Sequence, residues 1–201
     1  MKQMIITISR EFGSGGREIG FALAEKLGIP CYSRNLLEEF ADENDLDKEE
    51  LIRIDEKPKH FYHSRRVRGF SSSNQEQIEN IQFKLLKTKA VDEDSFVVIG
   101  RCADDVLKEF GETVTKIFIT GDDVFKTQRI MQKLDVSTRE AHRLMKFTDK
   151  SRKAYHDFYT TDKSKHWGQA NTYDLTVNSA TFGIEGTVDF IYSFLKTKYD
   201  I

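Results

Sequence analysis

The stretch "MIITISREFGSGGREIG", residues 4–20, decides the fold. Its first six residues are mostly apolar and β-branched, which is typical of a buried strand. Gly13, Gly15 and Gly16 follow, and the apolar residues Ile19 and Leu23 then repeat at helical spacing. A glycine-rich turn between a strand and a helix lets backbone N–H groups converge on an anion, and the helix dipole favours negative charge there. The stretch therefore predicts a phosphate-binding loop; the alternative is a tight turn that binds no ligand.

The rest of the chain alternates between strand-like and helix-like segments. Short apolar runs at 29–32, 96–100, 115–120 and 173–178 indicate four more strands. Helical spacing of apolar residues lies between them, at 78–85, 103–110, 122–134 and 184–197, with a further helical pattern at 36–40. Most strands are apolar on both faces, so we expect a three-layer α/β fold with a parallel sheet covered on two sides.

Two long intervals, 33–95 and 136–170, contain no convincing strand and carry most of the charge. We interpret each as a helical insertion that projects from the carboxyl edge of the sheet. The segment 64–75 has the composition of a loop, either bland or functional. The length of 201 residues suits one domain over 1–201.

Composition narrows the classes of function. A net charge of -2 argues against a nucleic-acid partner. No run reaches the roughly 18 apolar residues of a membrane span, and the N-terminus lacks a signal-peptide layout, so we expect a cytoplasmic protein. We expect it to be a monomer or a homodimer. Cys31 and Cys102 have no metal-like spacing and are interpreted as small buried residues.

The chain resembles the cytidylate kinase-like proteins, which are relatives of bacterial cytidylate kinase within the nucleoside monophosphate kinase superfamily. The blocks that carry the resemblance are "ITISREFGSGGREIGFALAEKLGIPCYSRNLL", "VVIGRCADDVL", "KIFITGDDVFKTQRI", "DKSRKAYHDFY" and "YDLTVNS". Together they extend over nearly the whole chain. The resemblance implies a P-loop kinase with a five-stranded parallel sheet, an acceptor-binding insertion within 33–95 and a helical lid within 136–170.

The phosphate loop departs from the pattern of ordinary cytidylate kinases. They place a glycine where this chain has Arg10, a lysine at Gly16, and the magnesium-holding Ser/Thr pair at Arg17 and Glu18. The lysine normally neutralises charge on the β- and γ-phosphates, so another cation is needed. Arg10 and Arg17 are the nearest candidates, and either could instead form an ion pair with a neighbouring glutamate.

The resemblance implies that the phosphate site consists of residues within 10–18 and two positions on a later helix. The donor phosphates are expected over Arg10, Gly13, Ser14, Gly15, Gly16, Arg17 and Glu18. Relatives carry one arginine near the donor base and another beside the phosphates on the helix after strand 115–120; Lys126 and Arg129 occupy these positions, and only Arg129 keeps the residue type. Magnesium would be held mainly by phosphates and water, with Glu18 or Asp104 as further ligands, and no ligand set is assigned.

A second block places the acceptor. In the family, an arginine that follows a strand and a glycine contacts the acceptor nucleotide, and Gly100 and Arg101 match this pattern. Ordinary cytidylate kinases have aspartates where this chain has Ile99 and Cys102, which weakens the expectation of cytidine as the base. Alternatively, Arg101 caps the edge of the sheet.

The third block lies in the predicted lid. Ser137 and Glu140 form a capping box for a helix over 138–153, and basic residues at 139, 143, 146, 150 and 153 make one solvated stripe. Arg152 points to the other, apolar side, with Asp149 beside it. In related kinases an Asp-x-x-Arg pair supports the transferred phosphoryl group, so Asp149 and Arg152 are predicted catalytic residues together with Arg17 and Arg129; an intrahelical ion pair is the alternative.

The resemblance implies ATP-dependent phosphoryl transfer to a nucleoside monophosphate, with CMP or dCMP as the acceptor and magnesium as the metal. Two alternatives stay open: a nucleotide-binding sensor or accessory protein whose altered loop does not turn the nucleotide over, and a kinase of a different small molecule.

Overall fold

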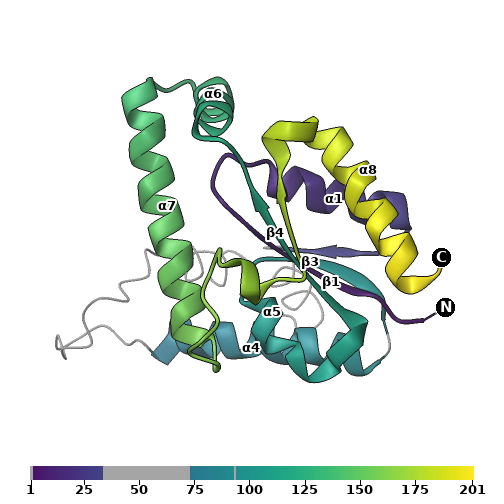
Figure 1. Ribbon diagram of the computed structural model, residues 1–201. Helices are drawn as coiled ribbons and strands as arrows, with labels where there is room; N and C mark the ends of the chain where they lie inside the picture. Colours follow the sequence, from purple (N-terminus) through teal and green to yellow (C-terminus); the bar gives the residue numbers. More distant parts are fainter. Residues whose placement is uncertain (1, 34–72, 93) are drawn as a thin grey trace, which may run out of the picture.

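The computed structural model describes residues 2–33, 73–92 and 94–201. Five strands form one parallel sheet in the order β2-β3-β1-β4-β5 (Figure 1). They are β1 (Ile5–Arg10), β2 (Cys31–Tyr32), β3 (Phe96–Ile99), β4 (Val114–Thr120) and β5 (Leu175–Asn178). The sheet of parallel strands predicted from the sequence is confirmed.

Helices cover both faces of this sheet. On one face lie α1 (Gly16–Leu27) and α8 (Ser179–Tyr199), whose buried side chains share a core with strands β1, β3, β4 and β5. On the other face lie α4 (Ser73–Val91) and α5 (Ala103–Val106), which is followed by the 3-10 turn η1 (Lys108–Thr113) (Figure 1). The three-layer α/β architecture is therefore confirmed.

The central strand β1 shows why the fold follows from the sequence. Ile6 and Ile8 belong to the core under α1 and α8, whereas Ile5 packs into the core under α4 and α5. All three side chains are at most 1% exposed. A strand buried on both faces needs mostly apolar residues at consecutive positions, and this explains why residues 4–8 are apolar apart from Thr7, which is itself 2% exposed.

Two helices stand beside the carboxyl edge of the sheet. These are α6 (Asp123–Leu134) and α7 (Thr138–Tyr159), which pack together through Ile130, Ala141 and Met145 (Figure 1). The hydroxyl of Ser137 accepts a hydrogen bond of 3.3 Å from the Glu140 N–H, so the predicted N-cap is present. After α7 the chain forms the short turn η2 (Ala170–Thr172) and enters β5.

Several predicted boundaries differ from the structure. The predicted helix 103–110 is one turn, α5, which ends at Val106 and is followed by η1; Gly111, whose φ is 58°, interrupts η1. The helix predicted at 138–153 continues to Tyr159, and that predicted at 184–197 begins at Ser179, with a kink at Gly183. The strand predicted at 173–178 begins at Leu175. The predicted helix at 36–40 and most of the segments 33–95 and 64–75 lie outside the described residues.

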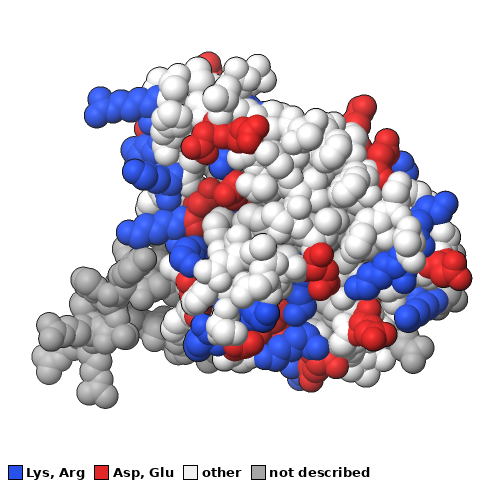
Figure 2. All heavy atoms as spheres, viewed as in Figure 1, with Lys and Arg blue, Asp and Glu red and all other residues white. Residues whose placement is uncertain are grey.

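The surface of α7 carries the predicted basic stripe. Figure 2 shows blue side chains along the α7 edge of the molecule, and Arg139, Arg143, Lys146, Lys150 and Lys153 are all exposed. Arg152 and Met145 face the opposite way and are partly or fully buried. Within the part of the chain that the structure describes, no helix has both the length and the apolar character needed to cross a membrane.

Candidate functional site

A cavity of about 720 Å³ opens at the carboxyl edge of the sheet. Its wall is formed by the ends of β1 and β3, the glycine loop, the start of α1, and residues of α6 and α7. Ligands of parallel α/β sheets bind at this edge, next to the loops that follow the central strands. The sequence prediction placed the phosphate loop here, and the structure brings that loop to the cavity.

The backbone of the glycine loop adopts conformations that would be strained for residues other than glycine. Gly13 and Gly15 have φ values of 85° and 77°, in the left-handed region. A side chain at Gly13 would also meet the Ile130 Cδ1 atom at 2.9 Å. Gly15 is the N-cap of α1 and provides no side-chain cap, so the first N–H groups of α1 are available to a bound anion.

Arg10 occupies a space created by two glycines. A Cβ atom on Gly16 would lie 2.5 Å from the Cβ of Arg10, and a Cβ on Gly100 would collide with the Nη1 atom of Arg10. The side chain of Arg10 thus runs from the end of β1, past Gly16, to the turn after β3, where it lines the cavity. A lysine at 16 does not fit while an arginine stands at 10, so the two departures from the usual loop are physically linked.

Arg17 and Arg129 approach the loop from two helices. Arg17 is exposed at the start of α1, and its guanidinium lies 5.4 Å from the centre of the Phe21 ring. Arg129 donates from Nε to the Gly13 carbonyl at 3.1 Å and from Nη2 to Glu18 at 2.7 Å. Arg129 therefore joins α6 to the phosphate loop.

Glu11 and Glu18, the two glutamates of the loop, form ion pairs with residues of α6. The sequence analysis had considered Arg10 and Arg17 as their partners instead. Glu11 accepts from Lys126 at 2.8 Å, and Glu18 accepts from Arg129 and also from Lys133, at 2.5 Å. Partial burial opposes the charge of Glu18, but hydrogen bonds from Lys133 and Arg129 outweigh it and lower the pKa of this carboxyl.

Asp149 and Arg152 join α7 to the backbone of the phosphate loop. Asp149 accepts a hydrogen bond of 2.7 Å from the Phe12 N–H, and Arg152 donates to the Arg10 carbonyl at 3.0 Å. The two side chains also form an intrahelical ion pair at 3.6 Å, which the sequence analysis gave as the alternative to a catalytic role. Burial raises the pKa of Asp149, against the lowering effect of the Phe12 hydrogen bond and the Arg152 charge. Arg152 lines the cavity.

The predicted acceptor side follows β3. Arg101 lines the cavity and has a φ of 63°, and the next residue, Cys102, has a φ of 50°. Near them, the Tyr155 hydroxyl of α7 donates to the Glu79 carboxylate of α4, which is 1% exposed. Burial, then the charge of Glu79, raises the pKa of Tyr155. Both insertions predicted from the sequence thus contribute described residues to this side.

Three predicted site residues, Ser14, Lys126 and Asp149, do not line the cavity. Lys126 is 6% exposed and its ammonium pairs with Glu11 and Asp123; burial opposes this charge, but these partners raise the pKa of Lys126. Ser14 is fully buried, and its hydroxyl donates to the Glu11 carbonyl at 2.9 Å. Lys126 holds the loop through Glu11, and its contact with ATP stays a prediction.

Neither carboxylate named for magnesium fits that metal. Glu18 is held by Arg129 and Lys133, and Asp104 lies 3% exposed against His156. Glu11, the other glutamate of the cavity wall, is occupied by Lys126. Magnesium takes oxygen ligands free of competing cations. Glu11 and Glu18 are paired with cations, and Asp104 stands beside an imidazole and a thiol, so these residues do not form a protein-held magnesium site.

The structure also brings residues to the cavity that the sequence analysis did not name. Tyr155, His156 and Ser151 come from α7, Trp167 from the loop that follows it, and Ser33 from the end of β2. Tyr155 and His156 stand three and four residues after Arg152, so the helical spacing from a predicted site residue would have found them. Trp167 packs edge-on against Phe118 of β4, at 5.1 Å between ring centres. No spacing signal in the sequence indicates this contact.

Comparison with known proteins agrees with this geometry. Residues 5–181 match the model of the cytidylate kinase-like family. The chain belongs to the cytidylate kinase-like family. A cytidylate kinase of Archaeoglobus fulgidus is 28% identical to this family member over 199 residues, which is 97% of this chain and 96% of the relative.

Solved structures share this fold. A protein of Eubacterium ventriosum superposes on this family member with a TM-score of 0.74 and 32% identity, covering 96% of this chain and 99% of its own. A shikimate kinase of Bacteroides thetaiotaomicron superposes with a TM-score of 0.56 at 14% identity, covering 96% of this chain and 98% of its own. The fold is that of the P-loop kinases, and the family and fold together are those of phosphotransferases.

Proposed function

We propose that this family member transfers a phosphoryl group from ATP to a nucleoside monophosphate, with CMP and dCMP as the first acceptors to test. One observation carries the proposal: six basic side chains, Arg10, Arg17, Arg101, Arg129, Lys133 and Arg152, line a cavity whose wall has two glutamates. The chain as a whole has a net charge of -2, so positive charge is concentrated at this cavity. Such a concentration attracts phosphate groups, which is the chemistry of both substrates.

Arg10 is proposed as the replacement for the missing lysine. Its side chain occupies the space beside Gly16 and ends near Gly100, at the junction of the phosphate loop with the predicted acceptor side. A guanidinium can bind two phosphate oxygens at once through parallel N–H donors. We therefore assign the charge neutralisation of the transferred phosphoryl group to Arg10, with Arg17 at the helix start.

The proposed reaction needs positioning rather than a protein base. The donor phosphates lie over Gly13, Gly15 and Gly16, and an oxygen of the acceptor phosphate, held by Arg101, attacks the γ-phosphorus. The bond from that phosphorus to the β-phosphate oxygen breaks, and ADP leaves. Because the attacking atom is an ionised phosphate oxygen, no proton has to be removed from it.

Helix α7 is the proposed lid of the site, and residues of 33–95 are proposed to bind the acceptor. Through Asp149 and Arg152, α7 is already docked on the phosphate loop in this structure. When ATP is present, Arg152 would exchange its Arg10 carbonyl partner for phosphate oxygens. Magnesium, when bound with ATP, supplies further charge neutralisation and is held by phosphates and water.

Two measurements test the proposal. ATP binding is followed by calorimetry, and ADP production is followed with each nucleoside monophosphate in turn. We expect submillimolar ATP binding and the fastest turnover with CMP or dCMP. Arg10→Ala should lower kcat/KM about 100-fold or more. Lys146→Ala, on the exposed face of α7, is the matched control and should leave turnover unchanged.

The other outcomes discriminate the alternatives. ATP binding without turnover on any acceptor would favour a sensor or accessory role. ATP binding with turnover only on an acceptor that is not a nucleotide would place the chain among small-molecule kinases. No ATP binding at millimolar concentration would overturn the proposal altogether.

A further inference from the structure

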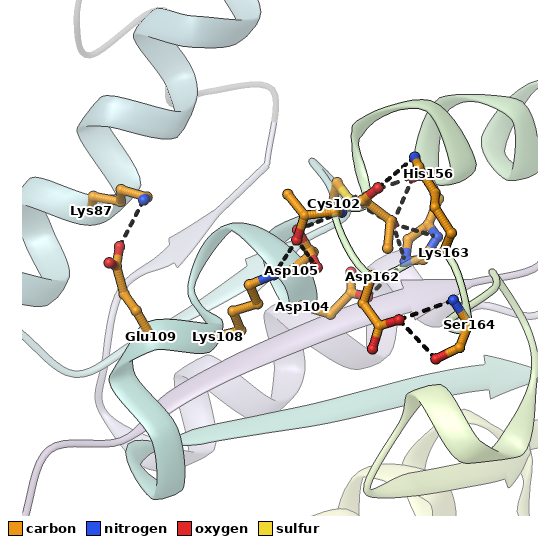
Figure 3. A network of polar contacts seen from close by, with 12 residues as sticks. Lys87, Cys102, Asp104, Asp105, Lys108, Glu109, His156, Asp162, Lys163 and Ser164 are labelled. Carbon is orange, nitrogen blue, oxygen red and sulfur yellow. Dashed lines mark hydrogen bonds and ion pairs between the residues drawn. The ribbon is translucent and has the colours of Figure 1, made fainter.

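A cluster of three buried side chains lies where the turn after β3 meets the lid helix α7. Cys102 and Asp104 come from the turn and from α5, and His156 comes from α7 (Figure 3). One ligand atom from each, a sulfur, a carboxylate oxygen and a ring nitrogen, lies within 4.8 Å of the other two. These residues are only 2–3% exposed. No role in phosphoryl transfer has been assigned to them.

The donor set suits one class of metal. Thiolate and imidazole are preferred by zinc and similar borderline or soft ions, whereas magnesium and calcium take oxygen ligands. Three protein ligands with one open position are typical of zinc sites that keep a water molecule. Cys102 and His156 line the cavity, so the open position would face it.

The surroundings of His156 also fit a metal ligand. Its Nε2 atom lies 2.7 Å from the Asp104 carboxylate, on the side of the cluster. Its Nδ1 atom lies 3.1 Å from the Thr160 hydroxyl and 3.7 Å from the Asp157 carboxylate. An oxygen partner on the second ring nitrogen fixes the ring orientation and makes the first nitrogen a better ligand.

An independent observation points to a missing partner. The Oδ1 atom of Asp104 is buried and has no hydrogen-bond partner among the described residues. The other oxygen of this carboxylate is the one that contacts His156. A buried carboxylate oxygen without a donor is costly, and a bound cation or its water would satisfy it.

We propose that Cys102, Asp104 and His156 form a zinc site that ties α7 to the turn after β3. On binding, bonds form from zinc to sulfur, oxygen and nitrogen, while the thiol releases its proton to solvent. The carboxylate and the thiolate together neutralise the charge of Zn²⁺. Zinc binding at this position requires no kinase activity.

The test uses the full chain after treatment with a chelator. Zinc is titrated by calorimetry, and cobalt is added in parallel because a thiolate ligand gives a sulfur-to-cobalt charge-transfer band. We expect one zinc per chain, the cobalt band, and a higher thermal midpoint with zinc than without. Cys102→Ser should abolish the band, and zinc affinity should fall about 100-fold or more in Cys102→Ser and His156→Gln.

Matched controls separate this cluster from other residues of the same type. Cys31→Ser removes the other cysteine, and His142→Gln changes an exposed histidine on the same helix; both should keep the cobalt band and the zinc affinity. The wild-type cobalt spectrum needs no variant, so poor folding of a variant leaves the test intact. A wild-type chain without the band, or a band that Cys31→Ser removes, overturns the proposal.

Discussion

At the scale of single residues, Arg10, Gly16 and Gly100 form one packing unit. The sequence analysis identified Arg10 and Arg17 as possible replacements for the lysine but gave no reason to choose between them. The reason lies in three segments, the end of β1, the start of α1 and the turn after β3, which meet only in the folded chain. Pattern and spacing could therefore predict the loop, but not which arginine occupies the space beside Gly16.

This packing predicts a coupling between positions 10 and 16. Gly16→Lys should lower the free energy of unfolding by about 1–3 kcal/mol, because the new Cβ collides with the Arg10 side chain. In an Arg10→Gly background the same substitution should cost clearly less, and the double-mutant cycle should give an interaction energy of about 0.5–3 kcal/mol. Urea denaturation of the four proteins measures it. Equal costs in both backgrounds would contradict the assigned packing.

At the scale of elements, α7 and the phosphate loop are joined by backbone contacts. The hydrogen bond between Asp149 and Phe12 spans 137 positions of the chain, and the one between Arg152 and Arg10 spans 142 positions. Helical periodicity predicted that Arg152 faces inward, with Asp149 beside it. It could not predict the partners, because these are main-chain groups of a distant loop.

The Phe12 hydrogen bond can be tested through Asp149. Asp149→Ala leaves the Phe12 N–H without its acceptor and Arg152 without its carboxylate, and should destabilise the fold by about 1–3 kcal/mol. Asp149→Asn keeps an acceptor oxygen and should cost less. Lys146 is exposed on the same helix, so Lys146→Ala should change the free energy of unfolding by no more than about 0.5 kcal/mol.

The pH dependence gives a second check on Asp149. Burial raises its pKa above the ordinary value of 3.8, so the folded chain binds this proton more tightly than the unfolded chain. The contribution of Asp149 to stability is therefore complete below pH 3.8 and is lost as the pH rises through the raised pKa. Unfolding measured over this pH range should show wild type losing stability relative to Asp149→Asn; an unchanged difference would argue against a buried Asp149.

At the scale of the whole molecule, two separate cores hold the sheet between its helix layers. The sequence predicted this architecture because continuous apolar strands alternate with amphipathic helices. The prediction from sequence was less accurate for the bounds of helices, because the left-handed φ values of Gly111 and Gly183 interrupt η1 and α8. It also assigned Cys102 only a packing role, since the sequence separation from His156 hides their proximity.

The central strands should dominate global stability. Ile117 of β4 is fully buried in the core under α1 and α8, so Ile117→Ala should lower the free energy of unfolding by about 2–5 kcal/mol. Val124 of α6 is 70% exposed, so Val124→Ala should change the free energy of unfolding by less than about 0.5 kcal/mol. Urea denaturation of both variants measures the contrast. Similar losses at the two positions would contradict the described core.

The placement of Arg10 between Gly16 and Gly100 affects how such proteins are found in genomes. A search pattern that demands lysine at the sixteenth position would discard this chain, although a positive side chain passes through that space from a neighbouring strand end. A pattern that instead asks for arginine at 10 together with glycine at 16 and 100 would collect chains that carry the same rearranged loop.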